Sequence, residues 1–536
     1  MKKLKLVCVA IAMAGAAPTF AGGLLTNTNQ HVAFNRMMSR EASIGIDGVY
    51  YNPAGVVFMG EGHHLAINWQ LAYQTRTINN DYKLFTNNVN NPITPRDFKG
   101  KAFAPVIPSF QYAYNKGKWS FQANFSLTGG GGKCTFDDGL GSFEKIVSET
   151  AIAACGLAGV VDQTLGNKLG QPGMEMFTSD QAFGKTGKYS FNSYMHGRQY
   201  YYGLSAGAAY KFCDNFSAFL GVRGVYALTN YYGYVENINV GNMPLYKVLD
   251  PSKETAANIE LSCDQTGVGF TPIIGVDYKT GRWNFSAKYE FKTRIRLKNK
   301  SVNQTPSIGN LPANLANQMT GILTDKFHNA GLPLEQAKQQ AENTTNAVLN
   351  DPTVGATMMG LKTQFDQKLN KAIGEYEDGK KIAGDIPAYL ALGIGYSPVD
   401  AVRVNVGFHW FDDKNATSYN NRNKELKRGT LEYNAGVEVD VNKKITLSTG
   451  WQNTNYGLSD EYMDDKSFVV GSNSAAIGGV YHINKKMDLN VAYFHTFYQH
   501  KKTSETVQLA ADKSIVYNSD YTRNNNVFAV GLDINF

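Results

Sequence analysis

The chain has 536 residues, of which 43% are hydrophobic and 12% aromatic, and its formal net charge is +7. Part of that charge comes from three lysines at the N-terminus, and no basic cluster stands out, so the composition gives no reason to expect a nucleic-acid partner. Beyond the N-terminal region no run of about 18 apolar residues occurs, which argues against a membrane-spanning helix. A membrane β-barrel has such a composition, because apolar residues occupy only every second position of its strands.

The N-terminus has the features of a secretory signal peptide. The basic residues are followed by an apolar stretch, Leu6 to Ala17, that is too short to span a bilayer. Thr19-Phe20-Ala21 then offers small residues at the positions that a signal peptidase recognises. We predict that residues 1–21 are a signal peptide, cleaved before Gly22, and that the mature chain is exported.

A segment of about forty residues, from Gly22 to Glu61, lacks the alternation of a strand. It is rich in Gly, Asn and Ser, and its centre contains the box Asn52-Pro53-Ala54-Gly55. Its apolar content is too high for a free tail. The apolar residues are Leu24, Leu25, Val32, Phe34, Met37, Met38, Ile44 and Ile46. We predict that residues 22–61 fold back into the lumen of a barrel as a plug.

From Gly62 onward, alternating segments recur between polar turns. The last segment ends the chain, with Phe528, Val530, Leu532, Ile534 and Phe536 on one face. Tight turns alternate with long connections, the longest covering about 131–198 and 301–382, which is the polarity of an outer-membrane barrel. We predict an all-β transmembrane protein: a 14-stranded antiparallel outer-membrane β-barrel over residues 62–536, whose even strand number closes the sheet.

Charged residues recur on one face of these strands. The residues are Arg403, His409, Glu432, Glu438 and Asp440. An unpaired charge in hydrocarbon is costly, so this face must be wet or internally paired. A diffusion porin for polar solutes would have such a lumen. We favour the alternative that these charges are paired and hold the N-terminal plug in place.

The long connection from Ser301 to Ile382 has helical periodicity. Apolar residues recur at three- to four-residue spacing over 311–327 and again over 358–376, with a weaker pattern over 334–349. These patterns predict amphipathic helices that pack on each other and roof the barrel, and the connection near 143–165 suggests another short helix. A ligand groove between the helices is a further hypothesis, with the candidate residues Leu315, Met319, Ile322, Phe327, Phe365 and Leu369.

The cysteines of the mature chain fall at opposite ends of the predicted barrel. Cys213 lies in a tight turn, whereas Cys134, Cys155 and Cys263 lie toward the long connections. A disulfide needs Cα atoms within about 7 Å, so Cys213 cannot reach the others. Export permits disulfides, and we prefer Cys134–Cys155, although Cys263 competes for either partner.

No motif of an enzyme is present in the sequence. Gly129 to Cys134 lacks the glycine spacing of a phosphate loop, and the adjacent His63 and His64 point to opposite faces of a strand. We predict that the chain is not an enzyme and needs no cofactor or metal.

The sequence resembles the FadL/TodX family of outer-membrane transporters of hydrophobic compounds. The resemblance is carried by the Asn52-Pro53-Ala54-Gly55 box, the preceding Ala42 to Asp47, the plug-like N-terminal segment and the aromatic C-terminal strand. It implies uptake of hydrophobic small molecules, long-chain fatty acids by default, across the outer membrane of a Gram-negative bacterium. The resemblance also implies that cargo is captured among the extracellular loops, passes to a lumen pocket gated by the N-terminal hatch, and leaves sideways through the barrel wall.

The resemblance also implies roles for particular residues. Leu24 and Leu25 stand where the family's hatch lines the lumen pocket, although ordinary plug packing explains them equally well. The third strand, Trp119 to Leu127, runs into Gly129-Gly130-Gly131-Gly132. Because glycines mark bulges and bends, this run is the candidate wall opening. The alternatives are a flexible loop start or a kink near Ala123 to Ser126.

The expected partners follow from the same reasoning. They are a hydrophobic ligand, outer-membrane lipid and lipopolysaccharide, and the barrel-assembly machinery, which would recognise the C-terminal strand. We expect a monomer.

Overall fold

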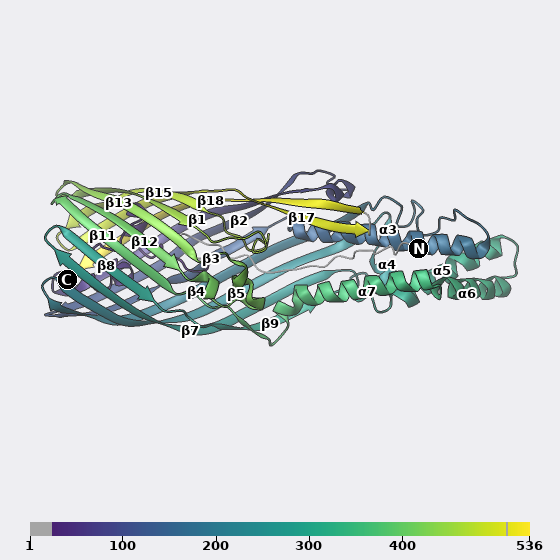
Figure 1. Cartoon of the computed structure of the whole chain (residues 1–536), viewed down its shortest axis with the longest axis horizontal. Coiled ribbons are helices and arrows are strands. Elements are labelled where there is room, and N and C mark those ends of the chain that lie inside the picture. The colour runs from purple at the N-terminus through teal and green to yellow at the C-terminus, as the bar shows by residue number, and fades with distance from the viewer. Residues whose placement is uncertain (1–23, 511–512) are drawn as a thin grey trace.

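A computed structural model describes residues 24–510 and 513–536, without the side chains of residues 131, 364–373 and 510. The predicted signal peptide lies outside the described residues. A β-barrel occupies one end of the elongated molecule, and helices project from its other end (Figure 1). The C-terminus lies at the end of the barrel opposite the helices (Figure 1).

The wall of the barrel is a closed antiparallel sheet of fourteen strands with a few shorter additions. The strands are β1 (Gly62–Tyr82), β2 (Arg96–Lys116), β3 (Trp119–Phe136), β4 (Tyr189–Cys213), β5 (Phe216–Val240), β7 (Ile259–Thr280), β8 (Trp283–Glu290) continued by β9 (Arg296–Gln304), β11 (Tyr389–Val399) preceded by β10 (Lys381–Ala383), β12 (Val402–Phe411), β13 (Thr430–Asn442), β14 (Ile445–Asn455), β15 (Ser472–Asn484), β16 (Met487–Tyr498) and β18 (Lys513–Asn535). The additions are β6 (Met243–Pro244) and β17 (Lys501–Ala510).

The first and last strands close the barrel. β1 pairs with β18 from His64–Asn535 to Tyr82–Tyr517, and with β2 on its other side. Closure leaves no edge whose backbone groups would face lipid unpaired. The predicted fold, strand number and start near Gly62 are confirmed.

The two faces of the wall differ as the alternation predicts. On β1, Ile67 and Trp69 are exposed on the outside, whereas Asn68 and Gln70 are buried inside. On β18, Phe528 is outside and Val527 inside. The outer face therefore presents apolar side chains to the membrane, and the inner face is largely polar.

The connections differ in length at the two ends. Tight turns join the strands at one end of the barrel, and the long connections lie at the opposite end. They contain α3 (Gly141–Leu169), α4 (Tyr246–Leu249), α5 (Leu311–Asn329), α6 (Leu334–Leu349), α7 (Pro352–Ile373) and the 3-10 helices η2 (Lys83–Asn87), η3 (Gly374–Tyr376), η4 (Asp413–Asn415) and η5 (Tyr419–Glu425). We call α3 to α7 the helical crown.

Some predicted boundaries were wrong. β3 and β4 extend beyond the predicted loop limits at 131 and 198, and β17 and β18 pair as a hairpin. The short helix expected near 143–165 is the 29-residue α3, which is long and apolar enough, by length and composition, to cross a membrane. More than half of its most apolar window is buried inside the protein.

The preferred disulfide was also wrong. Cys134, Cys155, Cys213 and Cys263 are all free thiols. Cys134 is fixed in β3 opposite Ala102, whereas the Cys155 Sγ on α3 contacts the Phe183 carbonyl oxygen at 3.4 Å. The sheet register and the helix therefore direct the two thiols to different neighbours.

Candidate functional site

The N-terminal segment fills the lumen. It contains α1 (Val32–Met37), α2 (Gly48–Tyr51) and η1 (Gly55–Phe58), and apart from Ile44 and Gly45 every residue from Thr26 to Val57 is buried. α1 packs against β13 to β16 and β18, α2 against β2 and β3, and η1 against β3, β4 and β7. The segment thus touches the wall on several sides and obstructs a straight aqueous path.

The Asn52-Pro53-Ala54-Gly55 box fastens this segment to three strands. The Asn52 Nδ2 donates to the Asp277 Oδ2 on β7 at 2.5 Å. The Pro53 carbonyl accepts from the Gln122 Nε2 on β3 at 2.7 Å, and the Ala54 carbonyl from the Ser217 Oγ on β5 at 2.7 Å. A Cβ at Gly55 would lie 2.4 Å from the Asn52 amide nitrogen. The box is therefore a tight turn that presents its carbonyl groups to the wall.

Ion pairs hold the other half of the segment. Glu438 on β13 accepts from Arg36 and, at 2.9 Å, from Arg40, which also pairs with Asp47 at 2.7 Å. All four side chains are buried. Removing one charged side chain from such a buried network leaves its partner's charge uncompensated.

A second ionic group lies beside the first. The His409 ring contacts Glu41 of the segment at 2.7 Å and Glu432 of β13 at 2.8 Å. Arg403, the remaining inward cation predicted from sequence, pairs with Asp440 at 2.6 Å. The prediction that these lumen charges are paired, and that some of them hold the segment, is confirmed by these contacts.

The pairing of β2 with β3 is interrupted. The strands pair from Gly100–Phe136 to Ala102–Cys134 and resume at Phe110–Phe125. No pairing joins residues 103–109 of β2 to 126–133 of β3 within the described sheet. We call these residues the unpaired stretch.

The composition of the unpaired stretch explains the interruption. β2 contributes Pro105 and Pro108, which have no N–H to donate to a ladder. β3 contributes Gly129 to Gly132, and its register against β4 shifts twice between Leu127 and Gly132. Gly130 and Gly132 have φ values of +72° and +132°, which favour glycine. The glycines thus lie inside β3 and not at the start of a loop, and the prolines opposite them escaped the sequence analysis.

The beginning of the N-terminal segment lies directly against this stretch. Thr26 forms an isolated β-bridge with Gly129, and the Asn27 N–H donates to the Thr128 carbonyl at 3.0 Å. A Cβ on Gly129 would lie 2.7 Å from the Leu25 carbonyl oxygen. The glycine therefore permits a close approach of two backbones at the interruption in the wall.

Leu24 and Leu25 have different surroundings. The Leu24 N–H donates to the Asp413 Oδ1 at 3.2 Å. Burial raises the pKa of Asp413 to about 6. The half-buried Leu25 side chain packs against an apolar cluster on the inner wall. The cluster comprises Tyr201, Val225, Ala227, Ile295, Leu297, Ile382 and Ile386.

Two arginines face each other nearby. Arg76 on β1 is the register partner of Arg523 on β18, and both side chains are buried. The Arg523 guanidinium donates to the Gln74 Oε1 at 2.9 Å and lies over the Tyr498 ring. Arg76 is also the register partner of Gly100 on β2. Gly100 lies two residues before Ala102, whose pair with Cys134 adjoins the unpaired stretch. No sequence pattern indicated this pair, because its members are far apart in the chain.

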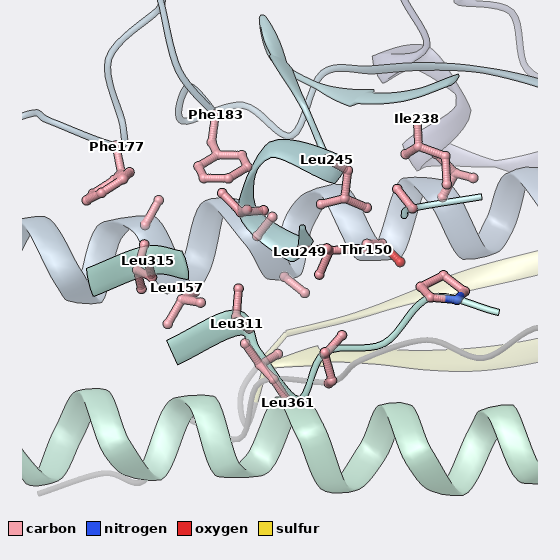
Figure 2. A pocket seen from close by; sticks show the side chains of 18 of the residues that line it. Thr150, Leu157, Phe177, Phe183, Ile238, Leu245, Leu249, Leu311, Leu315 and Leu361 are labelled. Atoms are coloured by element: carbon pink, nitrogen blue, oxygen red, sulfur yellow. The ribbon is translucent and has the colours of Figure 1, made fainter. Parts of the chain in front are cut away.

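An apolar cavity of about 140 Å³ lies within the helical crown. Figure 2 shows Leu157 of α3, Leu249 of α4, Leu315 of α5 and Leu361 of α7 directed into it. Thr150 is the one polar side chain among the described residues that line it. An apolar cavity of such a size stays dry and accepts an apolar ring or chain segment.

The predicted groove residues divide between several places. Leu315 lines the cavity, Met319 is buried in the adjoining core, and Phe327 packs against that core. Ile322 is 45% exposed and lies outside the cavity. The side chains of Phe365 and Leu369 lie outside the described residues. The sequence indicated the helices but missed the contributions of α3 and α4.

The end of the barrel with the tight turns contains polar cavities. One of about 600 Å³ is lined by Arg40, Arg282, Arg403 and Glu438, among others. A second, of about 210 Å³, is lined by Arg36, Asp47 and His482, among others. The lumen below the N-terminal segment is therefore polar and charged.

Comparisons with known proteins identify the fold. No protein-family model matches the sequence, and no curated protein matches it. The crystal structure of a Pseudomonas aeruginosa FadL homologue is similar, with a TM-score of 0.57 and 14% identity over 98% of this chain and 100% of that one. A deltaS2S3 mutant of TodX, a monoaromatic hydrocarbon channel, gives a TM-score of 0.50 and 13% identity over 94% and 98%. The chain thus has the β-barrel fold of these two proteins.

Proposed function

We propose that this protein takes up hydrophobic small molecules, with long-chain fatty acids as the first candidates, across the outer membrane. Cargo enters the cavity of the helical crown, moves to the inner wall beside Leu25, and leaves through the unpaired stretch between β2 and β3. The N-terminal segment acts as the hatch. The observation that carries the proposal is the contact of Thr26 and Asn27 with that stretch.

The contrast between the cavities supports a lateral exit. The crown cavity is apolar, whereas the straight route toward the tight turns passes Arg40, Arg403 and Glu438. An acyl chain gains roughly 0.8 kcal/mol per CH₂ on leaving water for hydrocarbon. Exit into the membrane therefore keeps the cargo out of water, and the filled lumen opposes a diffusion porin.

The arginine pair favours a carboxylate cargo over a neutral hydrocarbon. Two adjacent guanidinium groups attract a carboxylate more strongly than one, because buried charges are weakly screened. Arg76 and Arg523 lie near the end of the unpaired stretch that faces the crown. A fatty acid with its carboxylate there would have its chain beside the opening. The similar TodX protein is a monoaromatic hydrocarbon channel and gives a precedent for a neutral cargo. Fatty acids are the cargo that the resemblance to the FadL/TodX family implies.

A reversible cross-link tests the exit. Ser109 and Ser126 are both buried. They lie at the end of the unpaired stretch that adjoins the Phe110–Phe125 pair. In a chain with its native cysteines replaced by serine, Ser109→Cys/Ser126→Cys is bridged with a thiol reagent of adjustable length. Uptake of a fluorescent long-chain fatty acid into outer-membrane vesicles should fall at least about tenfold and recover on reduction.

A cysteine pair on the outer face of an uninterrupted part of the wall is the control. Thr449 and Ile477 are register partners in the continuous β14–β15 ladder. Bridging Thr449→Cys/Ile477→Cys should leave uptake unchanged. Normal uptake by the bridged Ser109→Cys/Ser126→Cys protein would exclude this exit.

A further inference from the structure

Basic residues line one strip of the outer wall. Arg294, Arg296, Lys298 and Lys300 alternate with buried Ile295, Leu297 and Asn299, and Lys292 precedes them. The Arg296 side chain is 52% exposed and that of Lys292 32%. Successive strand residues point to opposite faces, so these cations project outward. We call Lys292, Arg294, Arg296, Lys298 and Lys300 the basic stripe.

The stripe begins where the apolar outer surface ends. Tyr289 and Phe291 precede it on the same chain, with ring centroids 4.9 Å apart. On the neighbouring β7, Ile274 and Val276 are 44% and 41% exposed, and Ile274 is the register partner of Tyr289. β9 lies where the barrel meets the helical crown (Figure 1). Aromatic residues of outer-membrane barrels occupy the interface with the headgroups, so the stripe lies at headgroup height on the side of the long loops.

Few carboxylates neutralise the stripe. Asp385 pairs with Arg296 at 2.8 Å and with Lys292 at 4.0 Å, and Asp264 is the register partner of Lys300. In the part of the chain that the structure describes, Arg294, Lys298 and Lys300 form no ion pair.

The next strand adds a like charge. Lys381 on β10 is exposed and is the register partner of Lys298. Like charges directly opposite each other on neighbouring strands destabilise a sheet. An anion between them would remove this penalty and form charge-assisted hydrogen bonds with both side chains.

We propose that the basic stripe and Lys381 bind the phosphate groups of a phosphorylated glycolipid in the outer leaflet. The phosphates lie at the height of the cations, and the acyl chains lie along the apolar wall below, next to Ile274 and Val276 of β7. Each cation at a membrane surface adds to the attraction of an anionic headgroup. The site is separate from the cargo route and binds glycolipid whatever the cargo is.

Native mass spectrometry of the full chain in detergent tests the site. The variant is Arg294→Ser/Lys298→Ser/Lys300→Ser, which spares Arg296 and its pair with Asp385. The control is Lys443→Ser/Lys444→Ser/Lys485→Ser, which removes the same charge from exposed tight turns at the other end. The probes are diphosphorylated lipid A, the same lipid after phosphatase treatment, and inorganic phosphate as competitor.

The stripe variant should bind diphosphorylated lipid A at least about tenfold more weakly, with the control unchanged. The phosphatase-treated lipid should bind wild type as weakly as the intact lipid binds the variant. Equal binding of treated and intact lipid, or equal losses in variant and control, would overturn the proposal. Complete displacement of lipid A by equimolar inorganic phosphate would reassign the site to free phosphate. Retained fatty-acid uptake by the stripe variant verifies that it folds.

Discussion

The N-terminal segment is buried in the lumen and the helical crown has a buried apolar core, but different forces hold them. The segment is fixed by buried ion pairs and amide hydrogen bonds, such as Arg40 with Glu438 and Asn52 with Asp277. The crown is held by apolar packing around a cavity. Polar contacts need one geometry, whereas apolar contacts tolerate several. A gate benefits from the first property and a capture site from the second.

Deleting the N-terminal segment should have the largest effect. Without Gly22 to Met59 the lumen loses the residues that obstruct it, so steady ion conductance in planar bilayers should rise at least about tenfold. The full chain should show little steady current. A large current from the intact chain would instead support the porin alternative.

A single substitution should loosen the segment strongly. Glu438→Gln leaves Arg36 and Arg40 without their shared carboxylate, at a cost of about 3–5 kcal/mol. Amide hydrogen exchange over α1 and α2 should accelerate accordingly. The more exposed Arg403–Asp440 pair supplies the control, since Asp440→Asn should cost about 1 kcal/mol or less. Equal amide hydrogen exchange over α1 and α2 in both variants would show that Glu438 does not hold the segment in place.

The stability of the region around the buried Asp413 should depend on pH. The pKa of Asp413 is raised to about 6 by burial, so its contribution to stability is complete below pH 4 and is lost as pH rises through 6. The loss is about 3 kcal/mol. Hydrogen exchange around η4, corrected for intrinsic rates, should therefore be faster at pH 8 than at pH 5. Asp413→Asn should remove this difference, and its persistence would place the titrating group elsewhere.

Filling the crown cavity should have the smallest effect on stability. Ala153 lines the cavity, and Ala153→Leu should occupy part of its 140 Å³ with little strain. Binding of a fluorescent fatty acid should weaken about tenfold, or roughly 1.4 kcal/mol. Ala313→Leu, at an exposed position of α5, should leave binding unchanged. Unaltered binding by Ala153→Leu would exclude the cavity as a capture site.

The sequence by itself determined the barrel, because outward and inward residues alternate locally and each strand bears its own pattern. It also indicated the crown helices and the box near Asn52, whose signals extend over a few adjacent residues. The sequence suggested a defect in the barrel wall at Gly129 to Gly132. It did not indicate that the prolines of β2 lie opposite these glycines, because that depends on the register of β2 against β3. The untested expectation that the assembly machinery recognises the C-terminal strand rests on the same local pattern.

Only the tertiary structure decided what depends on partners far apart in the chain. Arg76 faces Arg523, Glu438 receives Arg36 and Arg40, and the cysteines remain apart. The basic stripe escaped the composition analysis because its cations alternate with apolar residues, and their outward direction follows from the sheet. Strand register in a closed barrel is set by all the pairings around the ring, so no single segment encodes which side chains meet across the lumen.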